Sequence, residues 1–451
     1  MGDREVGCFG KSTRVPQSAP AGGFFDNKGG IMRYRSGFMV CAACLAAGIG
    51  SARAAGTGFL SGMHVSGMLR AYDFTRYFSG SPPNRRAFAV GGGINLRSGT
   101  FHHVSADATF YTAHSLGLNP ANHAYVDGTL AGYGSIDTFG QAYLQYQRDA
   151  VLLRAGDQLI KTPWINPGDS RIVPETYQGL LAAFRPLPGL VVSALRITRF
   201  KSRTSDGFSS TNLYNATANH NIGGIGGLPG RTEPGAAALG ARYQTAGLKV
   251  AAWGYEFYDL AKMGWAEGSY TFGGPGGLRP LVGAQLVRET GAGGAYLGAV
   301  NANVYGAVAG VRRHRDLLTL GYDVVPAHPG TFANGDLVSP YTSGYATDPL
   351  YTTSIIQSLV DNRTSGHAWK VSATAFLLHH RLRAILSYAR YISARTALYT
   401  ASHTSETNID LTYFLQGALK GLSVRDRLAI AENMPVLHQF IYNRVMLQYQ
   451  F

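Results

Sequence analysis

Apolar and polar residues alternate with a period of two along much of this chain. Successive side chains of a β-strand point to opposite faces, so each alternating stretch predicts a strand with one apolar and one polar face. A soluble β-sandwich produces the same alternation, and the pattern alone does not separate it from a membrane barrel. The clearest stretches are 103–111, 141–147 and 369–375.

The chain ends inside such a stretch. An unpaired last strand would fray in water and expose its edge, whereas in a closed barrel it pairs with the first strand. The final strand therefore favours a barrel. One of its faces carries Val445, Leu447, Tyr449 and the terminal Phe451, and the other carries Arg444, Gln448 and Gln450, with Met446 among them.

The hydrophobic pattern also indicates how the chain would cross a membrane. After residue 54 no run of 18 apolar residues occurs, so membrane-spanning helices are not expected. Turn-rich segments such as 79–84 and 223–230 separate the alternating stretches. Lipid cannot satisfy an open sheet edge, so a spanning sheet must close. At about 22 residues per strand and connection, residues 55–451 would form about 18 strands around a water-filled lumen with a polar inner face. We therefore predict an all-β fold, a transmembrane antiparallel β-barrel.

Residues 32–54 have the three parts of an export signal. Arg33 and Arg35 precede a short apolar run over 37–50, and Ala52-Arg53-Ala54 provides the small-x-small cleavage pattern. The run is too short to cross a bilayer, which takes about 20 residues. The alternative is a buried N-terminal helix. We expect 32–54 to be a signal peptide, 1–31 to be an untranslated or non-native extension, and 55–451 to be the barrel.

Composition agrees with export to the outer membrane. Only 15% of the residues are charged, and Gly (58), Tyr (26) and Phe (21) are abundant. All three Cys lie within the first 44 residues, which excludes a disulfide framework or Cys-based zinc site downstream. Residues 1–54 hold seven of the 40 Lys/Arg and three of the 26 Asp/Glu, so the remaining chain keeps a formal charge of +10. A positive balance is compatible with nucleic acid, anionic lipid or anionic solutes. Because the basic residues are scattered and we expect the chain to be exported, we exclude nucleic acid.

Four segments of the chain resemble the OprD family of substrate-preferring outer-membrane porins. Each motif is modest, but their order and spacing cover residues 55–451. The segments are 66–76 (SGMLRAYDFTR), 170–179 (SRIVPETYQG), the predicted hairpin 406–427 with ETNID and KGLSVRDR, and the C-terminal strand.

The resemblance implies an 18-stranded barrel that inward loops narrow, with a row of Arg and Lys guiding carboxylate-bearing solutes. Guanidinium is always charged and matches a carboxylate with a fork of donors, and several weak contacts in series let the solute leave again. The matching basic positions are Arg76, Arg171, Arg425 and Arg427. Further channel-lining candidates are Arg444 on the polar face of the last strand, and Arg199 and Lys201 in a basic stretch. Arg199 and Lys201 share strand parity with Leu195 and Ile197, so an exposed strand end is the alternative for this stretch.

Strand parity supports Arg425 and Arg427 independently of the resemblance. Both share a face with Ser423, while Leu422, Val424 and Leu428 share the other. An Arg on the lipid face costs about 2–4 kcal/mol near the midplane, so we expect both in the lumen. Asp426 departs from this pattern, because it has lipid-face parity; we expect it near the interface or paired with a neighbouring strand.

Several alternatives remain open. Arg76 and Arg171 could instead tie an inward loop to the wall. The acidic wall that the resemblance implies is not evident, since only Asp361 could serve, which favours simple carboxylates over basic solutes. A barrel lipase or protease lacks support, because the chain has no Gly-x-Ser-x-Gly motif and its adjacent His pairs would point to opposite strand faces. A secreted β-sandwich adhesin would dissolve without detergent.

We therefore predict a porin rather than an enzyme, with no cofactor and no metal. The expected partners are small anionic or zwitterionic solutes, outer-membrane lipid, and the barrel assembly machinery, which would bind the strand that ends in Phe451. A monomer and a loose trimer are both compatible with the sequence.

Overall fold

The structure is a computed structural model that describes residues 58–451 apart from 61, 81, 215–233, 275, 362–363, 396–400 and 436. The expected signal peptide, the extension 1–31 and the glycine-rich segment 223–230 lie outside the described residues. Within the described part of the chain, no helix has the length and apolar character needed to span a bilayer.

Eighteen antiparallel strands form one sheet in which each strand pairs with the next along the chain. In the described parts of the connections, four short 3-10 helices occur, at His123–Tyr125, Phe332–Asn334, Leu359–Asp361 and Gly417–Leu419. The strands are β1 (His64–Phe78), β2 (Arg85–Arg97), β3 (Val104–His114), β4 (Ser135–Arg148), β5 (Val151–Gln158), β6 (Thr176–Phe184), β7 (Leu190–Lys201), β8 (Ala236–Gln244), β9 (Leu248–Phe257), β10 (Ala261–Thr271), β11 (Arg279–Gly291), β12 (Asn301–Arg313), β13 (Asp316–Val325), β14 (Gly366–Leu377), β15 (Leu382–Ser393), β16 (Ser402–Phe414), β17 (Leu422–Met434) and β18 (His438–Gln450).

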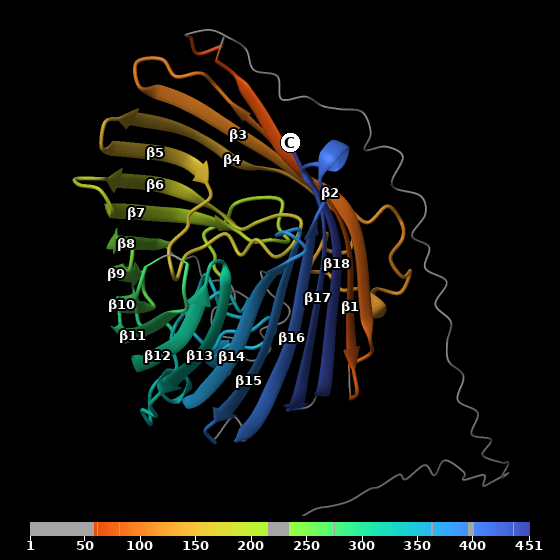
Figure 1. Cartoon of the computed structure of the whole chain (residues 1–451), viewed down its shortest axis with the longest axis vertical. Helices are drawn as coiled ribbons and strands as arrows, with labels where there is room; N and C mark the ends of the chain where they lie inside the picture. The colour runs from red at the N-terminus through yellow and green to blue at the C-terminus, as the bar shows by residue number, and fades with distance from the viewer. Residues whose placement is uncertain are drawn as a thin grey trace, which may run out of the picture. The chain divides into compact units, whose positions relative to one another are not determined.

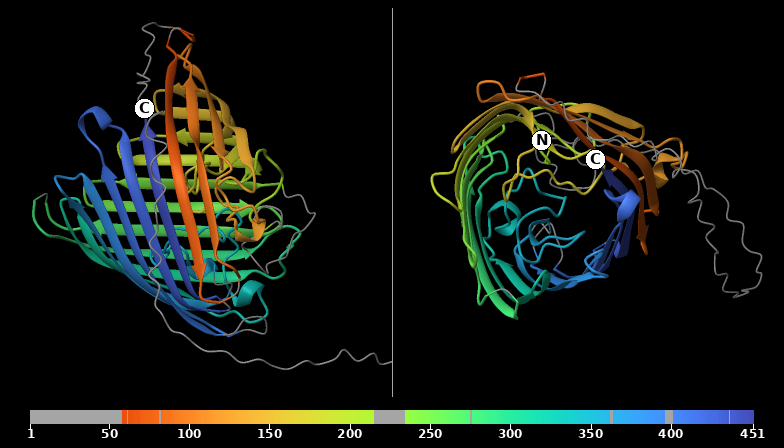
Figure 2. Two further views of the ribbon diagram at one scale, coloured as in Figure 1. Left: turned by 90° about the vertical axis from the view of Figure 1, so that its right-hand side faces the viewer. Right: turned by 45° about the horizontal axis from the view of Figure 1, so that its top comes forward.

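The last strand closes the barrel on the first (Figures 1 and 2). β18 pairs with β1 from Met68 opposite Gln450 to Phe78 opposite Phe440. Gly67 and Phe451 exchange two backbone hydrogen bonds of 3.0 and 3.1 Å. The terminal strand thus leaves no open edge, which lipid would not tolerate. The predicted barrel and its strand number are confirmed.

Alternation along the strands separates a lipid-facing surface from the interior. On β13, Leu318, Leu320 and Tyr322 are exposed outward, while Gly321 and Asp323, which have the opposite parity, are buried. On β17 the same alternation points Asp426 outward, where it accepts a hydrogen bond of 2.8 Å from the Asn443 amide of β18. Asp426, the acidic residue with lipid-face parity, is therefore hydrogen-bonded to a residue of the neighbouring strand, which is one of the two expected arrangements.

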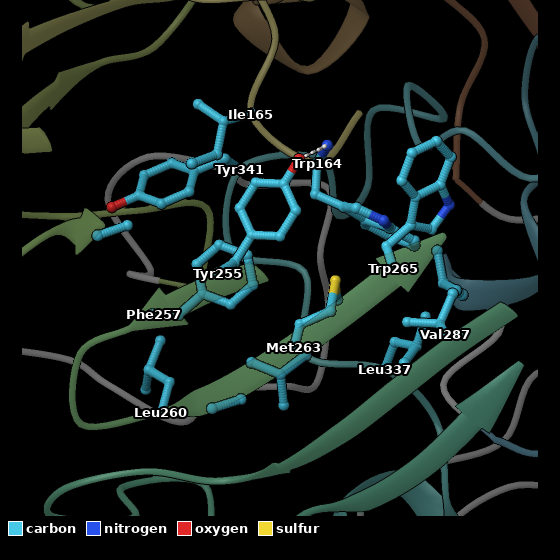
Figure 3. Packing of buried hydrophobic residues seen from close by; sticks show 14 of the residues in the cluster. Trp164, Ile165, Tyr255, Phe257, Leu260, Met263, Trp265, Val287, Leu337 and Tyr341 are labelled. Carbon is cyan, nitrogen blue, oxygen red and sulfur yellow. Dashed lines mark hydrogen bonds between the residues drawn. The ribbon is translucent and has the colours of Figure 1, made fainter. Parts of the chain in front are cut away.

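Two long connections fold into the barrel rather than away from it (Figure 2). They are the 159–175 loop between β5 and β6 and the 326–365 loop between β13 and β14. Trp164 and Leu337 from these loops pack with Tyr255, Met263 and Trp265 of the wall (Figure 3). The expectation of a polar inner face is thus wrong for this part of the wall, because the loops cover it and exclude water there.

The adjacent histidines also differ from expectation. His102-His103 and His379-His380 lie in the tight turns before β3 and β15, not within strands, and all four have positive φ. A turn places side chains by its backbone conformation rather than by strand parity. Among the described residues, no group of three or more His, Cys, Asp or Glu side chains is arranged to hold a metal.

Candidate functional site

A basic pocket lies inside the barrel against the wall formed by β15–β18 and β1. Its volume is about 240 Å³, and its lining comes from these five strands and from the 159–175 loop. Inward-facing positions of neighbouring strands bring together side chains that are far apart in the sequence. Six arginines line the pocket, namely Arg70, Arg171, Arg383, Arg425, Arg427 and Arg444, and Asp169 is the acidic residue among them.

Arg425 and Arg427 point into this pocket from β17, two residues apart on one face. Asp410, on the neighbouring strand β16, contacts both. Its carboxylate accepts from Arg425 Nε (2.8 Å) and Nη2 (2.5 Å) and lies 3.0 Å from Arg427 Nε. One carboxylate thus holds two guanidinium groups side by side, and part of each side chain remains exposed to the pocket. The parity argument for these two residues agrees with their placement.

Arg444 continues the basic row on β18, directly opposite Arg427 in the strand register. It is almost completely buried beside the ring of Tyr442, 4.2 Å from the ring centroid. Its Nη1 lies 3.4 Å from the Ser170 carbonyl of the 159–175 loop. Arg444 therefore lines the pocket wall, where it adds positive charge but offers little surface to a solute.

Arg171 and Arg76 make contacts that attach loops to the wall. Arg171 donates to the Tyr442 hydroxyl (2.5 Å) and to the Thr129 hydroxyl (3.2 Å), and its guanidinium lies over the Phe74 ring. Arg76 forms a buried ion pair of 2.8 Å with Asp127 in the β3–β4 connection. These contacts match the alternative in which the two arginines attach inward loops to the barrel wall.

Arg199 and Lys201 lie away from the pocket. A register irregularity between β6 and β7 pairs Gln178 with Arg199 but Gly179 with Ile197, so Thr198 is an extra residue. Such a bulge reverses the parity that follows it, and Arg199 is exposed although Ile197 is buried. Lys201 is completely buried, with its Nζ near the carbonyls of Pro174 and Ser202. Neither side chain lines the basic pocket.

Buried carboxylates hold the 326–365 loop against the wall. Glu289 on β11 accepts from the Val338 amide, and Asp323 on β13 accepts from the amide and hydroxyl of Thr352. Glu406 on β16 accepts from the three successive amides of Ile355, Ile356 and Gln357 at 2.8, 2.9 and 2.8 Å. Asp361, the expected acidic wall residue, accepts instead from loop amides of Gly344 and Ala346.

Replacing Glu406 with Gln should loosen this loop. The amide nitrogen of Gln cannot accept a hydrogen bond, so at least one buried backbone N–H would lose its acceptor, at a cost of about 1–3 kcal/mol. We expect larger and noisier single-channel currents in planar bilayers. Glu432→Gln is a matched control, because Glu432 is exposed near the end of β17. Currents identical to those of the unmodified protein would show that Glu406 does not anchor the loop.

The two inward loops also contact each other. Asn166 of the first donates to the Thr347 carbonyl of the second at 3.0 Å. At the start of β6, directly after the first loop, Tyr177 meets Tyr341 of the second loop edge to face. Nearby, burial raises the pKa of Glu175 to about 8, although the Arg203 guanidinium 3.9 Å away opposes this shift. Together the two loops cross the interior of the barrel, and the basic pocket lies beside them.

A second, larger cavity of about 1190 Å³ lies at the β6–β7 and β8–β9 turns and the adjoining part of β10. Its charged lining is more mixed, with Arg185, Arg242 and Lys249 against Glu267. The smaller pocket concentrates far more positive charge and includes the residues that parity analysis singled out.

Sequence reasoning did not single out four residues of the basic pocket or its rim. Arg70 and Asp410 lie within segments that resemble the family, but their contacts depend on which strands become neighbours in the sheet. Arg383 shares inward parity with the buried Ser387 of β15, so alternation could have identified it. Asp169 reaches the pocket only because its loop folds inward, for which the sequence contains no local signal.

A closed antiparallel barrel with inward loops and a charged interior defines the class of outer-membrane diffusion pores. The chain belongs to the OprD family, since the family model described as outer membrane porin, OprD family, matches residues 57–451. It is therefore an outer-membrane porin, and the expectations of a channel rather than an enzyme, and of the outer membrane as its location, are confirmed.

Solved structures show the same fold. OccK9 (OpdG) of Pseudomonas aeruginosa is 20% identical with a TM-score of 0.74, over 87% of this chain and 99% of that one. OpdK of the same organism, solved with vanillate, is 18% identical with a TM-score of 0.69, over 87% and 100%. OccK2 (OpdF) of the same organism, in complex with glucuronate, is 18% identical with a TM-score of 0.70, over 89% and 99%. A search of curated proteins returned no match.

Proposed function

We propose that this porin lets small carboxylate-bearing solutes diffuse across the outer membrane, and that the basic pocket gives it a preference for them. The observation that carries the proposal is the cluster of six arginines that line this pocket. Asp169 in the lining and Asp410 behind Arg425 and Arg427 are the acidic residues beside them. Structurally similar porins have been solved with vanillate and glucuronate, which are both carboxylates.

In this proposal the arginines have two roles. Arg425 and Arg427 contact the solute from β17, Arg70 and Arg383 extend the cationic surface to neighbouring strands, and Arg444 adds charge from the wall. Arg76 and Arg171 position the loops that shape the pocket. Because the pocket lies in contact with water, each ionic contact is weak, and the solute can pass from one guanidinium to the next.

Export and assembly are part of the proposal. Residues 32–54 have the order of a signal peptide, which supports secretion of the chain before it inserts. The pairing of β18 with β1 supports a role for the Phe451 end as the segment that the barrel assembly machinery binds.

Planar-bilayer recording of the purified protein tests the proposed preference. Under a salt gradient the zero-current potential should show preference for chloride over potassium. Glucuronate should reduce the ion current as its concentration rises, whereas glucose, which has nearly the same size but no charge, should not. Equal responses to both sugars, or preference for potassium, would contradict the proposal.

A further inference from the structure

One carboxylate of the protein already occupies the basic pocket in the way that a solute would. Asp169 of the 159–175 loop meets Arg70 of β1 with two parallel contacts, Nη1 to Oδ1 at 2.6 Å and Nη2 to Oδ2 at 3.1 Å. This fork-to-fork arrangement is the geometry with which guanidinium recognises a free carboxylate. The pair lies in the lining of the pocket, with Tyr72 nearby.

The guanidinium of this pair is fixed, whereas the carboxylate is accessible. Arg70 is only 6% exposed; its Nε donates to the Gln448 side chain at 2.8 Å, and its Nη1 also donates to the Arg171 carbonyl. Those contacts aim the Nη1–Nη2 edge at the pocket. Asp169 is 48% exposed, so water and solutes reach it.

We propose that Asp169 is a resident competitor that occupies the carboxylate site at Arg70 until a permeating solute displaces it. This inference rests on the proposed function and identifies Asp169 as the residue that sets how tightly the pocket binds a solute. The mobile element is the Asp169 side chain, because Arg171 anchors the adjacent backbone to Tyr442 and Thr129.

Displacement exchanges one carboxylate for another on the same guanidinium. Arg70 is therefore never left buried without a counterion, a state that would cost several kcal/mol and would make it bind the first available anion tightly. An intramolecular carboxylate competes at a millimolar effective concentration. A solute thus binds weakly and leaves quickly, as permeation requires.

The other acidic residue of this wall does not fit the same role. Asp410 is nearly buried within β16 and bridges Arg425 and Arg427 at once. A solute would have to break contacts with two guanidinium groups to replace it, and the freed aspartate, fixed on a strand, could not move away from the pocket. Asp410 therefore has a structural role, because it holds Arg425 and Arg427 in position. The exposed Asp169 side chain can instead be displaced by a solute.

Asp169→Asn tests the proposal, because it keeps the size of the side chain but removes its charge. We expect half-block of the ion current at about tenfold lower glucuronate concentration, which is the gain on removal of a competitor that occupies Arg70 about nine-tenths of the time, and longer glucuronate dwell times. Asp149→Asn is the matched control: it removes the same charge from an exposed turn beside Arg148. The control should behave like the unmodified protein. Asp169→Glu keeps a competing carboxylate and should not show the tenfold gain.

Heat-dependent migration on detergent gels verifies that each variant is a folded barrel, and Asp169→Ser provides a second charge-free variant. If glucuronate blocks Asp169→Asn and Asp169→Ser no better than the Asp149→Asn control, or blocks them less well, Asp169 is not a competitor and the inference is wrong. If glucuronate fails to block even the unmodified protein, which also shows no chloride preference, the proposed function fails, and the inference with it.

Discussion

Replacing both Arg425 and Arg427 with Ala should abolish most of the preference for anions. Each guanidinium that contacts a carboxylate at about 4 Å in water contributes about 1 kcal/mol. The loss of both charges then weakens anion binding by about 2 kcal/mol, or about thirtyfold. The zero-current potential under a salt gradient and the glucuronate concentration for half-block measure this change.

The two substitutions also leave Asp410 without its partners, and its free negative charge would repel anions further. Adding Asp410→Asn to the double variant separates these contributions, because it removes the stray charge while both arginines remain absent. Arg425→Lys with Arg427→Lys keeps the charge but loses the fork, so it should retain chloride preference better than carboxylate affinity. Unchanged chloride preference in the Ala double variant would refute the role of β17 in selectivity.

The strand pattern was predictable because lipid and water impose opposite demands on neighbouring residues. Arg425 and Arg427 alternate with Val424 and Leu428, and no irregularity interrupts β17 between them. The same reasoning fails for Arg199, because one extra residue at Thr198 reverses the parity. A bulge depends on the pairing of two strands, and a single sequence does not specify that pairing.

The interior of the barrel was harder to predict than its wall. The loops that cross the lumen have no periodicity, and long-range contacts such as that between Asn166 and Thr347 fix their course. For the same reason Asp169, which lies on one of these loops, could not be placed against Arg70 from sequence. Charges that share a strand can be predicted from alternation, whereas charges brought together by a loop require the structure.

Arg171→Ala should separate anchoring of the loop from guidance of the solute. The substitution removes the hydrogen bonds to Tyr442 and Thr129, a loss of about 3 kcal/mol for a charged donor. The 159–175 loop would then lose its main attachment to β18, and we expect higher conductance, greater current noise and faster proteolysis of the loop. Arg171→Lys should show a partial effect, because an ammonium group cannot reach both hydroxyls with a planar fork.

The contrast with the β17 variants distinguishes the two roles of arginine in this pore. Removal of a solute-guiding residue lowers the anion preference and leaves the permeability to neutral solutes unchanged. An anchoring residue changes the width and noise of the channel for every solute, and anion preference falls less, since the five other arginines of the pocket remain. If Arg171→Ala reduced anion preference as much as the β17 double variant, with no change in noise or proteolysis, Arg171 would belong to the solute-guiding row.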